Sequence, residues 1–250
     1  MISSTEYRGY QIYYRITDRV DTLSLGKDIV NKKYNVIDRY KDTERNFVAR
    51  VEIAGKQYVL KSPKAETVIP QRRVQTMFKK GEALNSLMNL SQYAKEGYNE
   101  FIVPRVVVVK RGMFIEESFI LMDYIEGEIL RTEEDIDSVV EIVKHIHSAG
   151  IYHGDLNTSN FIKTKDGIKI IDTQGKRENF WNFKRSYDIL TLKRDLLVMS
   201  FNYPVDEKME TRKDSLGYML AFMIKGFKQI PFVDKIRNLK RGLRNKGWKI

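Results

Sequence analysis

The chain has 250 residues, of which 42% are hydrophobic and 31% charged, a composition typical of a folded protein. This length allows one large domain or two lobes with a sizeable core. The chain contains no cysteine, which excludes a disulfide framework and a thiolate metal site. No apolar run approaches the roughly 20 residues of a membrane span, and the first residues lack the pattern of a signal peptide. We therefore expect a soluble, cytoplasmic protein.

The formal net charge of +11, from 44 basic and 33 acidic residues, indicates an anionic partner. The charge gathers at the end of the chain, where residues 235–250 contain seven Lys or Arg and no acid, interspersed with apolar residues. This pattern predicts peripheral contact with an anionic membrane, at about 1 kcal/mol per basic residue. A solvated tail is the alternative. No nucleic-acid partner is expected, because the aromatic residues fall in the predicted core rather than in a basic stripe.

The first half of the chain predicts mainly strands. Alternating or β-branched residues indicate strands at Tyr10–Arg15, Asn35–Tyr40, Phe47–Ile53, Gln57–Lys61, Phe101–Lys110 and Ser118–Tyr124. A hairpin turn is expected at Ala54–Lys56. Apolar residues at helical spacing predict one long helix over residues 71–94.

The second half predicts mainly helices. Thr132 and Asp135 form a capping-box pattern at the start of an amphipathic helix that Gly150 ends. A hairpin follows around Lys165–Gly167, and further helices follow it. The composition changes near residues 124–128, so we expect a strand-rich N-lobe (1–125) and a helical C-lobe (126–250) within one domain.

The stretch HGDLNTSNF, residues 153–161, consists mostly of residues that favour neither helix nor strand. It places Asp155 five positions before Asn160. A strand lysine (Lys61) and a helix acid (Glu82) precede it, and Asp172 follows it. Taken singly, each has an ordinary structural explanation, such as a solvated charge or a turn cap. Together, in this order, they are the parts that phosphoryl transfer from ATP requires.

The sequence resembles the protein-kinase-like superfamily in this set of motifs. Within that superfamily it is similar to the bacterial lipopolysaccharide core heptose(II) kinases. The segments that carry the second resemblance are EYRGYQIYY (6–14), GKQYVLKSPK (55–64), SFILMDYIEGEIL (118–130), NFIKTKDGIKIIDTQGK (160–176) and KRSYDILTLKRDL (184–196). It implies an α+β, two-lobed protein-kinase-like fold, with an antiparallel-sheet N-lobe and a mainly helical C-lobe.

The resemblance also implies a role for each matching residue. Lys61 would bind the nucleotide phosphates and Glu82 would pair with it, although Glu66 and Glu96 flank the same predicted helix. Asp155 would be the catalytic base. The remaining implied roles are Mg²⁺ binding by Asn160 and Asp172, a hinge against adenine at Asp123, Tyr124 and Ile125, and support of the catalytic loop by Asp188. ATP and Mg²⁺ are thus the expected cofactors.

The sequence departs from protein kinases at several of these motifs. Residues 41–46, KDTERN, contain no glycine where a glycine-rich loop is expected, so Thr43, Arg45 and Asn46 are candidates for phosphate contacts. Gly154 replaces an arginine before the catalytic aspartate. Asp172 begins Asp-Thr-Gln-Gly, and residues 173–187 leave little room for a peptide-binding activation segment. These departures favour a small-molecule or glycolipid acceptor.

The expected function is therefore ATP-dependent phosphorylation of a heptose hydroxyl of the lipopolysaccharide inner core, at the inner face of the cytoplasmic membrane of a Gram-negative bacterium. One alternative is a small atypical protein kinase of the type associated with transfer-RNA threonylcarbamoyl modification. Another is an inactive kinase fold that acts as a binding module. The sequence indicates neither the hydroxyl that is phosphorylated nor the oligomeric state.

Overall fold

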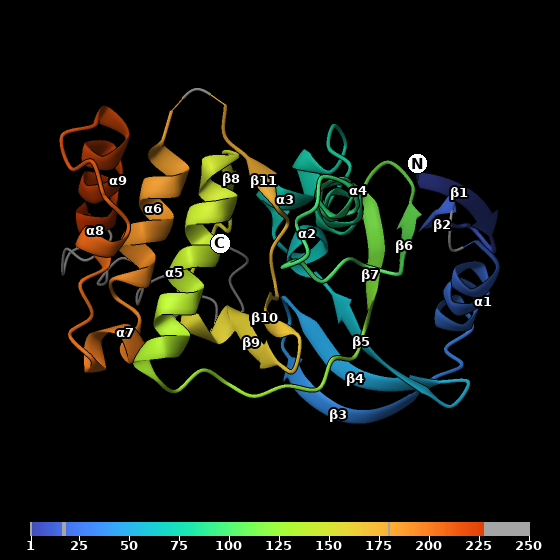
Figure 1. Ribbon diagram of the computed structural model, residues 1–250. Coiled ribbons are helices and arrows are strands. Elements are labelled where there is room, and N and C mark those ends of the chain that lie inside the picture. The colour runs from blue at the N-terminus through green and yellow to red at the C-terminus, as the bar shows by residue number, and fades with distance from the viewer. Residues whose placement is uncertain (1, 17–18, 180, 228–250) are drawn as a thin grey trace, which may run out of the picture. The chain divides into compact units, whose positions relative to one another are not determined.

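The computed structural model describes residues 2–16, 19–179 and 181–227 (Figure 1). Their contacts divide the chain into two compact units. Unit 1 is formed by the described residues up to Ile129 together with Ile162–Gly175. Unit 2 is formed by Leu130–Phe161 together with the described residues from Lys176 onward. The predicted lobe boundary, between residues 125 and 126, lies close to the point where the chain first passes from unit 1 to unit 2, between Ile129 and Leu130. Residues 162–175, by contrast, belong with the strand-rich unit 1.

An antiparallel sheet is the framework of unit 1. Among the described residues it has seven strands, in the spatial order β1 (Ile2–Tyr7), β2 (Tyr10–Arg15), β6 (Val106–Arg111), β7 (Ile115–Asp123), β5 (Lys56–Ser62), β4 (Phe47–Ile53) and β3 (Asn35–Asp42). The hairpin predicted between β4 and β5 is confirmed, with Ala54 and Gly55 both at positive φ. Such a turn matches the twist of the strands it joins.

Strand β6 is buried on both faces. Val106 and Val108 pack in the cluster that contains Leu25 of α1 (Arg19–Val30), whereas Val107 and Val109 pack against α4 (Glu82–Lys95). Successive side chains of a strand point to opposite faces, so an unbroken run of four valines fits a strand that is covered on both sides. The expectation that this strand begins at Phe101 was wrong, because Phe101 forms only an isolated bridge to Ile170.

The helix predicted over residues 71–94 was also wrong, because the chain breaks between two helices there. α3 (Pro70–Gln75) follows the short α2 (Ala65–Val68), and α4 begins only at Glu82. The Thr76 amide still donates to the Arg72 and Arg73 carbonyls at the end of α3, but its hydroxyl accepts the Ile115 amide at 3.1 Å and its carbonyl accepts Arg111. Gly81 then takes φ 87°, which allows the turn into α4.

Two elements of unit 1, β1 and α1, were not predicted. β1 extends the sheet through its pairing with β2. α1 contains Gly26 in its interior, which weakens the sequence signal for a helix. The structure supplies the reason for that glycine, since a Cβ atom there would lie 2.4 Å from Ile12 Cγ2 on β2. Gly26 therefore permits the close approach of α1 to the sheet.

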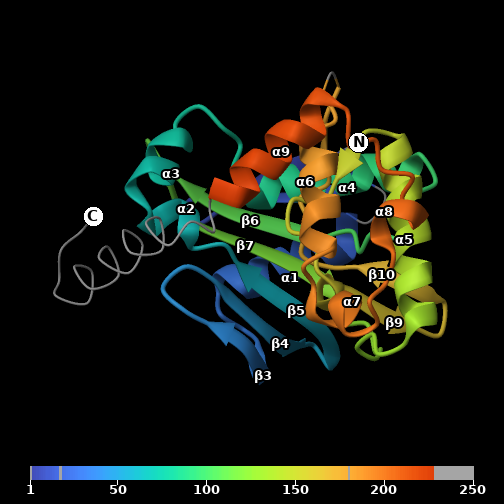
Figure 2. The ribbon, with the colours of Figure 1, turned by 90° about the vertical axis from the view of Figure 1, so that its left-hand side faces the viewer.

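Unit 2 is mainly helical. Its helices are α5 (Glu133–Ser148), α6 (Phe183–Leu192), α7 (Leu196–Ser200), α8 (Val205–Lys208) and α9 (Leu216–Phe227), and β8 (Ile151–Tyr152) pairs with β11 (Lys176–Arg177). The predicted capping box is confirmed, because Thr132 Oγ1 accepts the Asp135 amide while Asp135 accepts the Thr132 amide. Helix α9 lies along α6 in both views (Figures 1 and 2), and Tyr218 and Ala221 of α9 are buried against Leu190 of α6.

A short hairpin links the segments that carry the predicted site residues. Its strands, β9 (Phe161–Thr164) and β10 (Gly167–Ile170), and its turn confirm the prediction for this stretch. Thr164 Oγ1 stabilises the turn by donating to the Gly167 carbonyl at 2.6 Å. Among the helices described, none is both long enough and apolar enough to cross a bilayer.

Candidate functional site

Lys61 lies between two carboxylates in unit 1. It belongs to β5, and its Nζ atom is 3.2 Å from Glu82 Oε1 at the first turn of α4. Its Nζ also donates to Asp172 Oδ1, just beyond β10. The Lys61 side chain is only 13% exposed. Three residues that together span more than one hundred positions of the sequence therefore form one charge cluster.

The charge of Lys61 follows from this environment. Burial alone would lower its pKa, but the carboxylates of Glu82 and Asp172 outweigh burial and raise the pKa above its ordinary value. Lys61 is thus a cation throughout the physiological pH range. A fixed cation with two bound carboxylates can exchange one of them for a phosphate oxygen without a change of protonation.

Glu82 is placed by the break between α3 and α4. Its backbone amide donates to Glu66 Oε1 at 2.8 Å, so Glu66 of α2 satisfies one of the unpaired amides at the start of α4. Glu96 lies at the opposite end of α4, where Gln92 donates to it. Of the three acids considered for the partner of Lys61, only Glu82 is within ion-pair distance of it among the described residues.

Asp172 has an unusual backbone. Its φ of 55° lies in the left-handed region, which non-glycine residues rarely adopt and which concentrates at functional sites. The segment after it is held to α4, because Asn89 Nδ2 donates to the Gln174 carbonyl at 2.9 Å. Gly175, also at positive φ, passes so close to Leu90 and Tyr93 that a Cβ atom would clash with both. The Asp-Thr-Gln-Gly sequence thereby fixes Asp172 beside Lys61.

The predicted hinge residues continue from the end of β7. The Tyr124 amide donates weakly to the Gln57 carbonyl at 3.4 Å, and Asp123 accepts Arg105 Nε at 2.8 and 2.9 Å. Arg50 lies over the Tyr124 ring, 4.3 Å from its centroid. These contacts position Asp123 and Tyr124 in unit 1, while the contact of residues 123–125 with adenine remains a prediction.

The glycine-free segment 41–46 forms the tight turn between β3 and β4. Thr43 and Asn46 close it on themselves: the Thr43 amide donates to the Asn46 carbonyl at 2.9 Å, and the Asn46 amide donates to Thr43 Oγ1 at 3.1 Å. The backbone amides of Thr43 and Asn46 and the Thr43 hydroxyl are therefore used in closing the turn. Arg45 is exposed at its tip.

The loop of residues 153–160 lies in unit 2 and is organised around Asp155. Asn160 Nδ2 donates to the Asp155 carbonyl at 2.7 Å, which closes the loop across the interval noted in the sequence. Asn157 Nδ2 donates to Asp155 Oδ1 at 2.9 Å and so orients the carboxylate, which remains exposed. The Asp155 amide in turn donates to His153 Nδ1 at 3.3 Å.

Two acids, one fully buried and one partly buried, support the backbone of this loop. Asp188 of α6 is fully buried and accepts the amides of His153 at 2.6 Å and Gly154 at 2.9 Å, with His147 Nε2 3.4 Å away. Asp195, the N-cap of α7, accepts the amide and hydroxyl of Thr158 at 3.0 and 2.8 Å. Asp188 was anticipated; Asp195 was not, although an Asp before the Leu-Leu start of a helix is a capping signal.

The predicted site residues thus form two sets. Lys61, Glu82 and Asp172 are gathered in unit 1, together with the ordered hinge segment. Asp155 and Asn160 are gathered in unit 2. The first set offers a cation and an exposed carboxylate, and the second offers an oriented carboxylate beside an amide. Such groups can bind phosphates, hold a hard cation and accept a proton from a hydroxyl.

Comparison with known proteins places these two sets in a family. Residues 1–203 match the family described as lipopolysaccharide core biosynthesis protein (WaaY). A curated relative, the lipopolysaccharide core heptose(II) kinase WaaY of Escherichia coli, is 24% identical over 189 residues, which cover 70% of this chain and 79% of the relative.

Two further proteins are similar to this chain. A probable bifunctional tRNA threonylcarbamoyladenosine biosynthesis protein of Methanococcus vannielii is 26% identical over 75% of this chain, but the match covers 35% of that protein. The solved structure of WaaP in complex with acyl carrier protein aligns over 80% of this chain and 90% of that chain, with a TM-score of 0.50 and 15% identity. The fold is therefore kinase-like, as predicted. Because the family match covers most of the sequence, the chain belongs to the WaaY family of lipopolysaccharide core biosynthesis proteins.

Proposed function

We propose that this protein transfers the γ-phosphate of ATP to a heptose hydroxyl of the lipopolysaccharide inner core. Membership of the WaaY family and the heptose(II) kinase activity named for its Escherichia coli relative support this proposal. The structural observation that carries it is the cation of Lys61 held between Glu82 and Asp172. An inactive binding module would have no need to keep this buried cluster together with an oriented Asp155.

On the nucleotide side, Lys61 would bind phosphate oxygens and stabilise the negative charge of the transferring group. Glu82 would keep the lysine in position, since its own amide is fixed by Glu66. The backbone of residues 123–125 would receive adenine. Because Thr43 and Asn46 close their turn on themselves, we assign phosphate binding to Lys61 and a metal ion rather than to amides of this turn.

The chemistry of Asp172 and Asn160 fits Mg²⁺, which prefers oxygen ligands and keeps several waters. The Asp172 side chain is 55% exposed. Asn160 uses its Nδ2 atom within the loop, which leaves its amide oxygen for a metal. The described residues contain no cluster of three or more acidic, histidine or cysteine side chains able to enclose a metal ion. This favours an ion shared with the nucleotide, and the ion would neutralise charge on the phosphates when bound.

On the acceptor side, Asp155 would accept the proton of the attacking heptose hydroxyl. That oxygen forms a bond to the γ-phosphorus, the bond to the bridging oxygen of ADP breaks, and the proton passes to the Asp155 carboxylate. Asn157 Nδ2 donates to Asp155 Oδ1 at 2.9 Å and so holds the carboxylate in place. Asp188 and Asp195 keep the backbone of the loop in place, so catalysis rests mainly on positioning.

The decisive test is the transfer of radiolabelled γ-phosphate from ATP in the presence of Mg²⁺ to three parallel samples: kinase-deficient lipopolysaccharide core, a generic protein and no acceptor. We expect label on the core alone. Asp155→Ala should reduce turnover roughly 10²–10⁴-fold, a typical effect of losing a general base. Asp166→Ala, in the exposed β9–β10 turn, is the matched control and should leave it unchanged. Label on protein alone would favour the atypical protein kinase, and no label would favour the binding module.

We further propose that the protein contacts an anionic membrane surface, where such a glycolipid acceptor resides. The predicted basic segment 235–250 lies outside the described residues, but α9 directly precedes this part of the chain. One face of α9 packs on α6, while its other face exposes large apolar side chains, with Leu216 68%, Phe222 56% and Phe227 62% exposed. Aliphatic and aromatic groups beside a basic segment suit insertion into a negatively charged bilayer.

Vesicle sedimentation tests this contact. Phe222→Ser with Phe227→Ser should weaken binding to phosphatidylglycerol vesicles and leave ATP affinity unchanged. Met113→Ser, at an exposed position of unit 1, is the control and should bind as the unaltered protein does. Removal of residues 235–250 should have an additional effect that salt abolishes. Equal binding of all variants would exclude α9 from the contact.

A further inference from the structure

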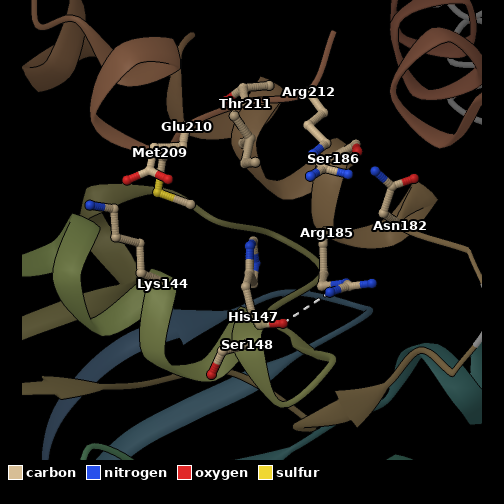
Figure 3. A pocket seen from close by; sticks show the side chains of 11 residues that line it. Lys144, His147, Ser148, Asn182, Arg185, Ser186, Met209, Glu210, Thr211 and Arg212 are labelled. Carbon is tan, nitrogen blue, oxygen red and sulfur yellow. Dashed lines mark hydrogen bonds between the residues drawn. The ribbon is translucent and has the colours of Figure 1, made fainter. Parts of the chain in front are cut away.

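Unit 2 contains a basic pocket that takes no part in the proposed reaction (Figure 3). It has a volume of about 300 Å³, near the lower end for small-molecule sites. Its walls come from the last turns of α5, the first turns of α6 and the segment after α8. They consist of Lys144, His147, Ser148, Asn182, Arg185, Ser186, Ile189, Met209, Glu210, Thr211 and Arg212.

The charge of this basic pocket is positive. Lys144, Arg185 and Arg212 face a single acid, Glu210. Figure 3 shows the side chains of His147 and Arg212 pointing into the hollow from opposite walls. Within the part of the chain that the structure describes, the Arg212 guanidinium forms no ion pair. Lys144 is paired only with Glu141, one helical turn earlier on an exposed face, which is a weak interaction.

Two polar atoms of residues that line the pocket lack hydrogen-bond partners among the described residues. Thr211 Oγ1 and Arg185 Nε are buried and accept or donate no hydrogen bond among the described residues. Arg185 Nε is 3.6 Å from Glu178 Oε2, and only its Nη1 atom has a close acceptor, the His147 carbonyl at 3.0 Å. Because both atoms are closed to solvent, a ligand in the pocket would be held by the accessible groups that line it rather than by these two atoms.

The first amides of α6 are already satisfied. Glu178 accepts the amide of Lys184 at 2.9 Å and that of Arg185 at 3.4 Å, so it occupies the position where an anion would bind a helix N-terminus. A ligand of the pocket would therefore be held by side chains, above all by the guanidinium groups, whose planar geometry suits phosphate and carboxylate.

The pocket is also connected to the catalytic loop within unit 2. His147 lines it and places Nε2 3.4 Å from Asp188 Oδ2. Asp188 accepts the amides of His153 and Gly154, directly before Asp155. One side chain therefore separates a ligand of the pocket from the carboxylate that supports the loop.

We propose that this basic pocket binds a small phosphorylated or carboxylated compound, and that its occupancy stabilises the support of the catalytic loop through His147 and Asp188. The compound is an effector rather than the nucleotide, since none of the proposed nucleotide ligands lines the pocket. Binding of a compound to this pocket does not depend on which sugar accepts the phosphate, nor on whether the protein is an active kinase.

The three histidines of the chain provide a direct assay. Their ring resonances are followed by NMR during titration with inorganic phosphate, at constant ionic strength maintained with chloride. His147 lines the pocket, His153 lies in the catalytic loop, and His145 is exposed and does not line the pocket. We expect His147 and His153 to shift with the same midpoint and His145 to stay unchanged. The variants His145→Gln and His153→Gln assign the signals.

Arg212→Gln should weaken phosphate binding about tenfold, the effect of losing one charge-assisted hydrogen bond. Arg194→Gln, a charge-matched change elsewhere in unit 2, should leave the midpoint unchanged. Phosphate binding at the nucleotide site would move His153 without this dependence on Arg212. The proposal is overturned if all three rings shift alike, if His147 does not move, or if Arg212→Gln and Arg194→Gln behave the same. A shift of His147 without one of His153 would overturn the coupling.

Discussion

Replacement of Asp188 tests how the loop of residues 153–160 is held. Asp188 is fully buried and its carboxylate accepts two short hydrogen bonds, from the amides of His153 at 2.6 Å and Gly154 at 2.9 Å. Hydrogen bonds to a charged group contribute about 1.5–3 kcal/mol each. Asp188→Ala would leave both amides without an acceptor in the interior. The contact to His147 Nε2, at 3.4 Å, is longer and adds less than either of these hydrogen bonds. We therefore expect a loss of about 3–5 kcal/mol in the free energy of unfolding of this region.

Asp188→Asn is the companion variant, because the side chain keeps its size. One amide can still donate to the Asn oxygen, but the other faces its NH₂ group, so about half of that loss is expected, roughly 1.5–3 kcal/mol. Urea denaturation followed by circular dichroism measures the global effect. Hydrogen exchange at the amides of His153 and Gly154 measures the local one, and both amides should exchange faster.

Asp214→Ala removes an exposed acid of the same unit and should change stability by less than about 0.5 kcal/mol. If Asp188→Ala matched this control in stability and in amide exchange, Asp188 would not be the support of the loop. If Asp188→Ala does not fold, Asp188→Asn provides the test, because it should retain the fold and show faster exchange at the same two amides.

Three further predictions follow from single contacts. The raised pKa of Lys61 means that its ion pairs stabilise the fold fully below its unfolded-state pKa of about 10.5 and are lost only as the pH rises through the higher folded-state value. The difference in urea stability between the protein and Lys61→Met should thus be constant from about pH 7 to about pH 9.5, and a decline within this range would contradict the assigned charge. Thr132→Ala should cost about 1 kcal/mol by removing the capping box of α5, whereas Ser138→Ala on the exposed side of the same helix should cost much less. Gly81→Ala should destabilise unit 1 and weaken ATP binding, because the new Cβ would lie 2.3 Å from Ile115 Cδ1 and displace Glu82 from Lys61; unchanged thermal stability would show that the turn adapts.

Much of the fold could be predicted because local pattern and tertiary environment agree. The period-two alternation of β4 predicts a strand and the Thr132–Asp135 pair predicts a capping box, and the structure contains both. The predicted helix over 71–94 was wrong because Thr76 interacts with β6 and β7, which lie more than thirty residues later in the sequence. α1 was missed because Gly26 lowers helix propensity for the sake of a contact with β2, a constraint that only the folded structure reveals.

In the candidate site, too, some features could be predicted from the sequence and others depend on tertiary contacts. The set of Lys61, Asp155, Asn160 and Asp172 predicted the chemistry, because phosphoryl transfer needs these residue types and the protein-kinase-like fold sets their order. The resemblance named Glu82 as the acid paired with Lys61, although Glu66 and Glu96 flank the same predicted helix. The structure distinguishes them by position: Glu66 caps α4, whereas Glu82 reaches the lysine. The contact of Asp195 with Thr158 and the basic pocket both arise from packing between segments far apart in sequence, so no local motif predicts them.

The most direct test of the proposed activity is mass spectrometry of the core oligosaccharide released after reaction with ATP and Mg²⁺. We predict the addition of one phosphate, located by fragmentation on a heptose, and its absence when Asp155→Ala replaces the active protein. Phosphate on another core sugar, or an unmodified core from a protein that binds ATP, would contradict the assignment as a heptose kinase.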